Sequence, residues 1–91
     1  MRERWFGATG RRVPELAVEG ELDTAGALVL DSVEDDARLR EAFDAGTPVV
    51  VRADGVDGIK RALARPEVAS VLVPAGRREL LDVDLTELTY G

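Results

Sequence analysis

The sequence of 91 residues contains no histidine, no cysteine and a single lysine, Lys60. Histidine and cysteine supply many of the bases, nucleophiles and metal ligands that enzymes use near neutral pH. Their absence excludes a Ser-His-Asp triad and a disulfide scaffold. Any chemistry would rest on carboxylates, arginines, a few hydroxyl groups and the backbone. The sequence therefore favours the interpretation that the protein is not an enzyme and has no catalytic residue and no cofactor.

Long apolar runs are also missing, and none approaches the roughly 18 residues that a membrane-spanning helix needs. The first six residues, Met-Arg-Glu-Arg-Trp-Phe, lack the apolar segment of a signal peptide. The apolar fraction of 45% is typical of a folded chain rather than a disordered one. We therefore expect one globular domain in the cytoplasm, with no membrane partner.

Acidic side chains outnumber basic ones, 18 against 12, which gives a net charge of −6. An acidic surface with almost no lysine is typical of proteins from salt-accumulating halophiles, in which carboxylates hold water and counter-ions. A GC-rich genome, which also replaces lysine by arginine, is the alternative explanation. In molar salt the Debye length is only about 3 Å, so the acidic excess says little about partners.

The first part of the chain has the opposite charge, because residues 1–12 contain four arginines against one glutamate. The basic residues are Arg2, Arg4, Arg11 and Arg12. Trp5 and Phe6 lie among them, and basic segments with aromatic side chains can bind nucleic acid by stacking and charge neutralisation. The alternative is that this basic arm, 1–12, docks on its own acidic domain, 13–91, or on a second subunit.

Apolar patterns predict strands at residues 16–22, 27–30, 47–51 and 68–73. A helix is expected from an N-cap at Asp31 or Ser32 to a stop at Gly46, with Leu39, Ala42 and Phe43 as its apolar stripe. A second helix follows Asp54 and Gly55, and a short one covers 74–81. A last edge strand is expected around 83–85, and Gly7 and Gly10 predict a bend in the arm.

Strands that alternate with helices in this way form two consecutive βαβ units, with parallel strands and right-handed crossovers. The strand at 16–22 is joined to 27–30 by a short turn, so we expect it to add an antiparallel hairpin strand. The predicted fold is a small single-domain α/β protein with a mixed sheet of four to five strands. Two or three helices would leave one face of the sheet partly bare, which favours a homodimer.

In a parallel α/β sheet, ligands bind beyond the carboxyl ends of the strands. The residues expected at that edge are Asp31, Asp54, Asp57 and Gly76. They form the candidate binding site. The alternative is that the three aspartates only cap helices or occupy their first turns, where the helix dipole favours negative charge.

The segment Leu16-Ala-Val-Glu-Gly-Glu-Leu-Asp resembles the first motif of Toprim domains, an apolar strand that ends in Glu-Gly. The segment Val49-Val-Val-Arg-Ala-Asp-Gly-Val-Asp is similar to the Asp-x-Asp strand end of that family, although its acids are three positions apart instead of two. The resemblance implies that Glu19, Asp54 and Asp57 hold Mg²⁺ in a nucleic-acid enzyme. The alternative places Glu19 on a strand as a solvent-facing residue.

Taken together, these features favour a non-catalytic protein-association module or a regulatory subunit. Its expected partner is a second copy or another protein. A Toprim-like Mg²⁺ enzyme and nucleic-acid binding through the basic arm are the two alternatives.

Overall fold

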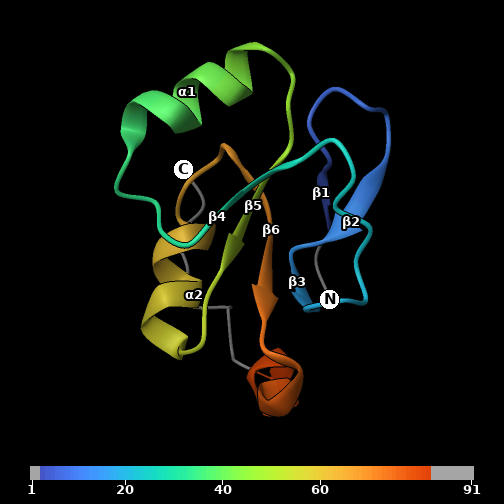
Figure 1. The fold of residues 1–91 in the computed structure, drawn as a ribbon, viewed down its shortest axis with the longest axis vertical. Helices are drawn as coiled ribbons and strands as arrows, with labels where there is room; N and C mark the ends of the chain where they lie inside the picture. Colours follow the sequence, from blue (N-terminus) through green and yellow to red (C-terminus); the bar gives the residue numbers. More distant parts are fainter. Residues whose placement is uncertain (1–2, 83–91) are drawn as a thin grey trace.

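The structure is a computed structural model, and it describes residues 3–82. Its elements follow the chain from a hairpin at the amino end to a 3-10 helix at the carboxyl end (Figure 1). They are β1 (Glu3–Trp5), β2 (Arg12–Pro14), β3 (Leu16–Val18), β4 (Leu28–Leu30), α1 (Asp36–Asp44), β5 (Val49–Arg52), α2 (Val56–Leu63), β6 (Val68–Val73) and η1 (Ala75–Asp82). The protein is a small mixed α/β domain, as the sequence predicts.

A parallel sheet of four strands in the order β3-β6-β5-β4 forms the centre of the domain. The chain steps from β4 through α1 to β5, and then through α2 to β6, which confirms the two predicted βαβ units. Every residue of β6 is buried, as are the three valines of β5. Uninterrupted β-branched runs suit these positions because central parallel strands are covered on both faces.

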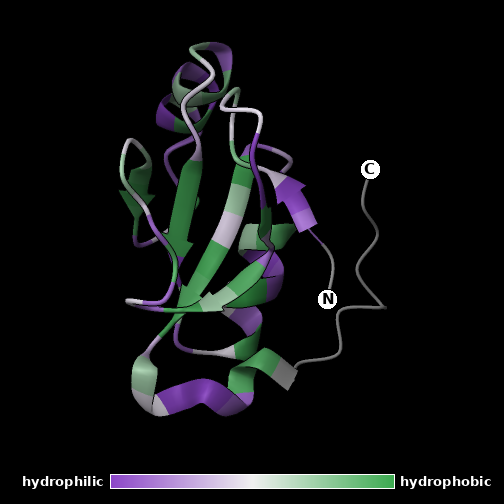
Figure 2. Ribbon diagram, turned by 90° about the vertical axis from the view of Figure 1, so that its right-hand side faces the viewer, coloured by the Kyte–Doolittle hydropathy of each residue, from purple (hydrophilic) through white to green (hydrophobic). Residues whose placement is uncertain are grey.

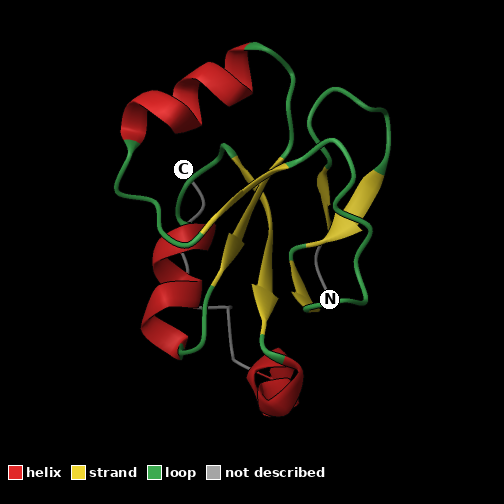
Figure 3. Ribbon diagram, in the orientation of Figure 1, coloured by secondary structure: helices red, strands yellow, loops and turns green. Residues whose placement is uncertain are grey.

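The predicted pairing of residues 16–22 with 27–30 is wrong. β3 covers only Leu16–Val18 and lies parallel to β6 at the far edge of the sheet, with Leu16 opposite Val71. Gly20, with φ of +90°, turns the chain away, and the following loop crosses one face of the sheet to reach β4. The antiparallel pair is formed instead by β1 and β2, which stand apart from the four-stranded sheet (Figure 3).

The two faces of the sheet are covered by different parts of the chain. The helices cover one face with six buried side chains, Leu39, Ala42, Ile59, Ala62, Leu63 and Leu80. Phe6 and Val13 of the β1–β2 hairpin (residues 3–14) cover part of the other face. Leu22 and Ala27 of the crossing loop pack beside them. Figure 2 shows the resulting pattern, with the strands mainly hydrophobic and the middle of η1 hydrophilic.

The ends of the helices agree with the sequence except at one point. α2 begins at Val56 after Gly55, and Gly46, with φ of +76°, follows α1 as the expected stop. The start of α1 differs, because its N-cap is Asp35, whose carboxylate accepts a hydrogen bond from the backbone N–H of Arg38 at 3.1 Å. The short helix at 74–81 is η1, a 3-10 helix. The predicted strand around 83–85 lies outside the described residues.

Within residues 3–82, no helix combines the length and the apolar character needed to cross a bilayer. The described part of the chain measures 33 × 26 × 21 Å along its principal axes. The turn of the β1–β2 hairpin packs against the loop before β5.

Two glycines allow the hairpin to approach that loop closely. Gly7 and Gly46 both have positive φ, and the backbone N–H of Ala8 donates to the carbonyl oxygen of Gly46 at 2.9 Å. A Cβ atom on Gly7 would lie 2.4 Å from that same oxygen and 2.7 Å from the nitrogen of Pro48. Backbone atoms cannot move aside as a flexible side chain can, so position 7 requires glycine for both its φ and its packing.

We predict that Gly7→Ala lowers the free energy of unfolding by about 2–4 kcal/mol, from backbone strain plus the overlap with Gly46. Gly10→Ala is the matched control, because Gly10 also has positive φ but nothing lies within 4 Å of its added Cβ. It should lose only the strain, about 1 kcal/mol. Urea denaturation followed by circular dichroism measures both losses. Equal losses would show that the contact with Gly46 contributes nothing.

Candidate functional site

The structure brings together two of the four residues predicted at the carboxyl edge of the sheet. Asp31 and Asp54 line a shallow pocket of about 150 Å³ between the ends of β4 and β5 and the start of α2. Asp57 lies in the first turn of α2, and Gly76 lies in η1; neither lines this pocket. The edge therefore has a small polar recess, which Arg52 and Arg61 also line.

Arg52 binds two acids along this edge. Its Nε atom lies 3.2 Å from Oε1 of Glu19, and its Nη1 atom lies 3.7 Å from Oδ1 of Asp31. These side chains come from the ends of β5, β3 and β4, so the arginine spans the strand β6 between the first two. All three side chains are about half exposed or more, so each pair contributes at most about 1 kcal/mol.

The arrangement does not support the Mg²⁺ site implied by the Toprim resemblance. Glu19 pairs with Arg52, and it lies beyond β6 from the strand that precedes Asp54 and Asp57. Across residues 3–82, no group of three or more acidic side chains could hold a metal ion. In the strand order, β6 lies between the strand that precedes Glu19 and the strand that precedes Asp54.

The arginines of the predicted basic arm lie in three different environments. Arg4 is largely buried. Arg11 lies over the ring of Phe6 at 4.5 Å, and it donates to the backbone oxygen of Asp23 at 3.0 Å. Arg12 lies over the ring of Trp5 at 5.2 Å. Arg2 lies outside the described residues.

Arg4 joins the hairpin to the rest of the domain through four hydrogen bonds. Its guanidinium donates to the carboxylate of Glu15 at 3.1 Å. It also donates to the backbone oxygens of Leu63, Arg65 and Val68 at 2.6, 3.2 and 2.8 Å. Two of these oxygens lie at the carboxyl end of α2, where the helix dipole favours a cation. Glu15 is only 2% exposed, so the pair satisfies a carboxylate that would otherwise be costly to bury.

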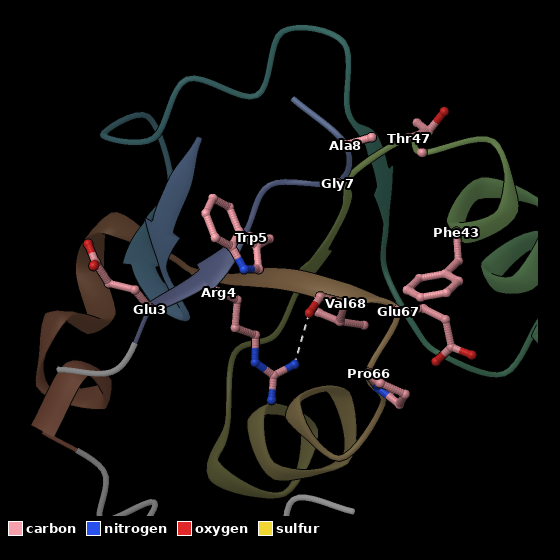
Figure 4. Close-up of a pocket in the computed structure, with 11 residues that line it drawn as sticks. Glu3, Arg4, Trp5, Gly7, Ala8, Phe43, Thr47, Pro66, Glu67 and Val68 are labelled. Atoms are coloured by element: carbon pink, nitrogen blue, oxygen red, sulfur yellow. Dashed lines mark hydrogen bonds between the residues drawn. The ribbon is translucent and has the colours of Figure 1, made fainter. Parts of the chain in front are cut away.

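A groove of about 580 Å³ lies between the hairpin and the carboxyl end of α1 (Figure 4). Trp5 and Phe43 lie on opposite sides of the view, with Val68 between them. Trp5 is 61% exposed and Phe43 is 58% exposed, the two highest values among the large hydrophobic residues described. The remaining lining residues are Glu3, Arg4, Gly7, Ala8, Gly46, Thr47, Pro66 and Glu67. We refer to this recess as the aromatic groove.

The charged residues of the aromatic groove are mostly acidic. Glu3 is exposed and forms no ion pair within residues 3–82. Glu67 pairs with Arg65 at 3.3 Å, and Asp36 binds the same guanidinium at 2.6 Å. The hydrogen bonds to Glu67 and then to Asp36 raise the pKa of Arg65 above its already high ordinary value. The guanidinium of Arg65 thus pairs with two carboxylates. The guanidinium of Arg4 points toward the interior of the domain, where it binds Glu15 and Val68 (Figure 4).

The aromatic groove was not predicted from the sequence. The predicted apolar stripe of α1 contains Leu39, Ala42 and Phe43, but only Leu39 and Ala42 are buried. Phe43 follows Ala42 directly, so its side chain lies about 100° further around the helix. One signal was present in the sequence, because half of the four aromatic residues fall within the first six positions.

Comparison of the chain with protein-family models, with curated proteins and with solved structures found no match. By its fold and its surface, the protein is a small α/β domain with a groove flanked by two exposed aromatic rings.

We predict that Arg4→Ala lowers the free energy of unfolding by about 3–5 kcal/mol, because it leaves Glu15 buried without its guanidinium. Arg4→Lys should lose less, since an ammonium group keeps the charge but cannot reach four acceptors at once. Arg11→Ala is the control, because its ion pair with Asp23 is exposed and should contribute below about 1 kcal/mol. Chemical denaturation measures the three losses, and an Arg4→Ala loss as small as that of Arg11→Ala would contradict the assignment.

Proposed function

We propose that this protein is a non-catalytic protein-association module that binds a polypeptide through the aromatic groove. The ligand is an extended segment that carries an apolar or aromatic side chain next to an arginine or lysine. The exposure of Trp5 and Phe43 on either side of one groove is the observation that carries the proposal. Aromatic residues are enriched at the centres of protein interfaces, where a few of them supply most of the binding energy.

The exposed rings could supply a useful part of that energy. Together they offer roughly 200 Å² of ring surface, which at about 25 cal/mol per Å² corresponds to about 5 kcal/mol. Association costs at least about 4 kcal/mol in lost translational and rotational freedom. The groove alone therefore favours weak, reversible binding, to which contacts outside it would add.

The acids of the groove select the charge of the ligand. Glu3 and Glu67 would attract a cationic side chain and would repel a phosphate or a carboxylate. For this reason we favour a basic polypeptide over nucleic acid, although Arg11 and Arg12 lie on the same hairpin. The recess at the carboxyl edge is a weaker candidate, because it is smaller and its Arg52 already pairs with Asp31.

Trp5 is the single tryptophan of the chain, so its fluorescence reports directly on the groove. We predict that a short synthetic peptide with Leu and Pro flanked by arginines shifts the emission of Trp5 to the blue. A matched peptide with glutamates in place of the arginines should bind at least about tenfold more weakly, because like charges meet at Glu3 and Glu67. An isothermal titration with both peptides supplies the dissociation constants.

The controls use two exposed apolar residues of the same domain. Phe43→Ser should weaken binding of the basic peptide about tenfold or more. Val56→Ser should leave it unchanged, because Val56 is 41% exposed but lies on α2 outside the groove. Equal effects of the two substitutions, or no response to either peptide, would overturn the proposal. A response to single-stranded oligonucleotide alone would favour nucleic-acid binding.

A further inference from the structure

The hairpin that forms one wall of the aromatic groove carries the same features that the groove selects. Trp5 is 61% exposed, and the guanidinium of Arg12 lies 5.2 Å from the centre of its ring. Arg12 is itself exposed and forms no ion pair within the described residues. An aromatic ring with an adjacent, uncompensated cation is the ligand class proposed above. Here it stands on a rigid hairpin of this chain.

We propose that the polypeptide bound in the groove is a second copy of this chain. Trp5 and Arg12 of each protomer enter the groove of the other, where the ring packs against Phe43 and the cation lies near Glu3 and Glu67. This inference rests on the proposed function, and it names the partner.

A two-fold dimer requires a surface that is complementary to itself. The surface formed by the hairpin and the groove could meet that requirement, because Arg12 lies over the ring of Trp5, which lines the groove together with Phe43, Glu3 and Glu67. Trp5 lines the groove of its own protomer and is 61% exposed, so its ring is accessible to a partner. Each dimer would then cover two tryptophans and two phenylalanines, so the apolar contribution to the free energy of binding would be twice that of a single groove.

The hairpin needs little ordering before it binds. Arg4 holds β1 against the end of α2 and the start of β6, and Phe6 is only 2% exposed beneath the same strand. The backbone of Trp5 lies between these two anchors. A preorganised ring loses less conformational entropy on binding than one on a free segment, which favours docking of this hairpin.

The experiment is a charge exchange followed by sedimentation equilibrium. Wild-type protein should pass from monomer to dimer as its concentration rises, with a concentration-dependent blue shift of Trp5 emission. Arg12→Glu and Glu3→Arg should each raise the dimer dissociation constant by about tenfold or more, because like charges then meet in both grooves. Both positions are exposed, so the fold should be retained, which circular dichroism checks.

An equimolar mixture of the two variants should regain the wild-type dissociation constant, because each cation then faces an acid. A wild-type monomer at all concentrations, or a mixture that is no tighter than its components, would overturn the second copy as the occupant. A monomer that still binds the arginine peptide would reject this inference and leave the proposed function standing. Failure of the peptide in a protein that dimerises, with no effect of Phe43→Ser on the dimer, would reject both.

Discussion

The guanidinium of Arg4 is the group on which the arrangement of this domain depends. It draws together three parts of the chain that are far apart in sequence: β1, Glu15 after β2, and the end of α2 with the start of β6. β1 supplies the donor, and the other two parts supply acceptors that would be costly to leave without a donor away from water. An arginine satisfies several acceptors at once because its five N–H groups form a rigid planar fork. The position of the hairpin, and with it one wall of the aromatic groove, follows from this contact.

The other constraints on the groove act through the backbone. Gly7 and Gly46 bring the turn of the hairpin against the loop before β5, with a distance that excludes a side chain. On the opposite side, Leu39 and Ala42 fix α1 on the sheet and leave Phe43 outside the core. These contacts hold the backbone at Trp5 and at Phe43 in place, and in that position both rings are exposed. This distinguishes the groove from an accidental patch on a loose segment, since rigid walls reduce the entropic cost of binding.

The parts of the fold that sequence could predict are those encoded locally. The apolar runs of β5 and β6, the helix stop at Gly46 and the helix start after Gly55 are each encoded within a few residues. The pairing of β3 with β6 depends on residues more than fifty positions apart, and a short turn at residues 23–26 suggested a nearer partner. Arg4 belongs to the basic arm, for which docking on its own domain was one of the alternatives, but the particular acceptors of a buried arginine are supplied only by the tertiary structure. The groove depended on both of these contacts, so it could not be predicted.

The acidic excess of the chain bears on how ion pairs and apolar contacts would share the binding energy in the aromatic groove. In concentrated salt a charge pair across an interface is screened within a few ångströms, whereas burial of apolar surface is maintained or strengthened by excluded salts. Trp5 and Phe43 would then supply the affinity, while Arg12, Glu3 and Glu67 would fix the orientation of the contact. On a surface that repels itself through a net charge of −6, a patch with both signs of charge and two exposed rings is where the proposed dimer would form. Self-association through this patch is therefore compatible with the same acidic surface that keeps the rest of the protein apart.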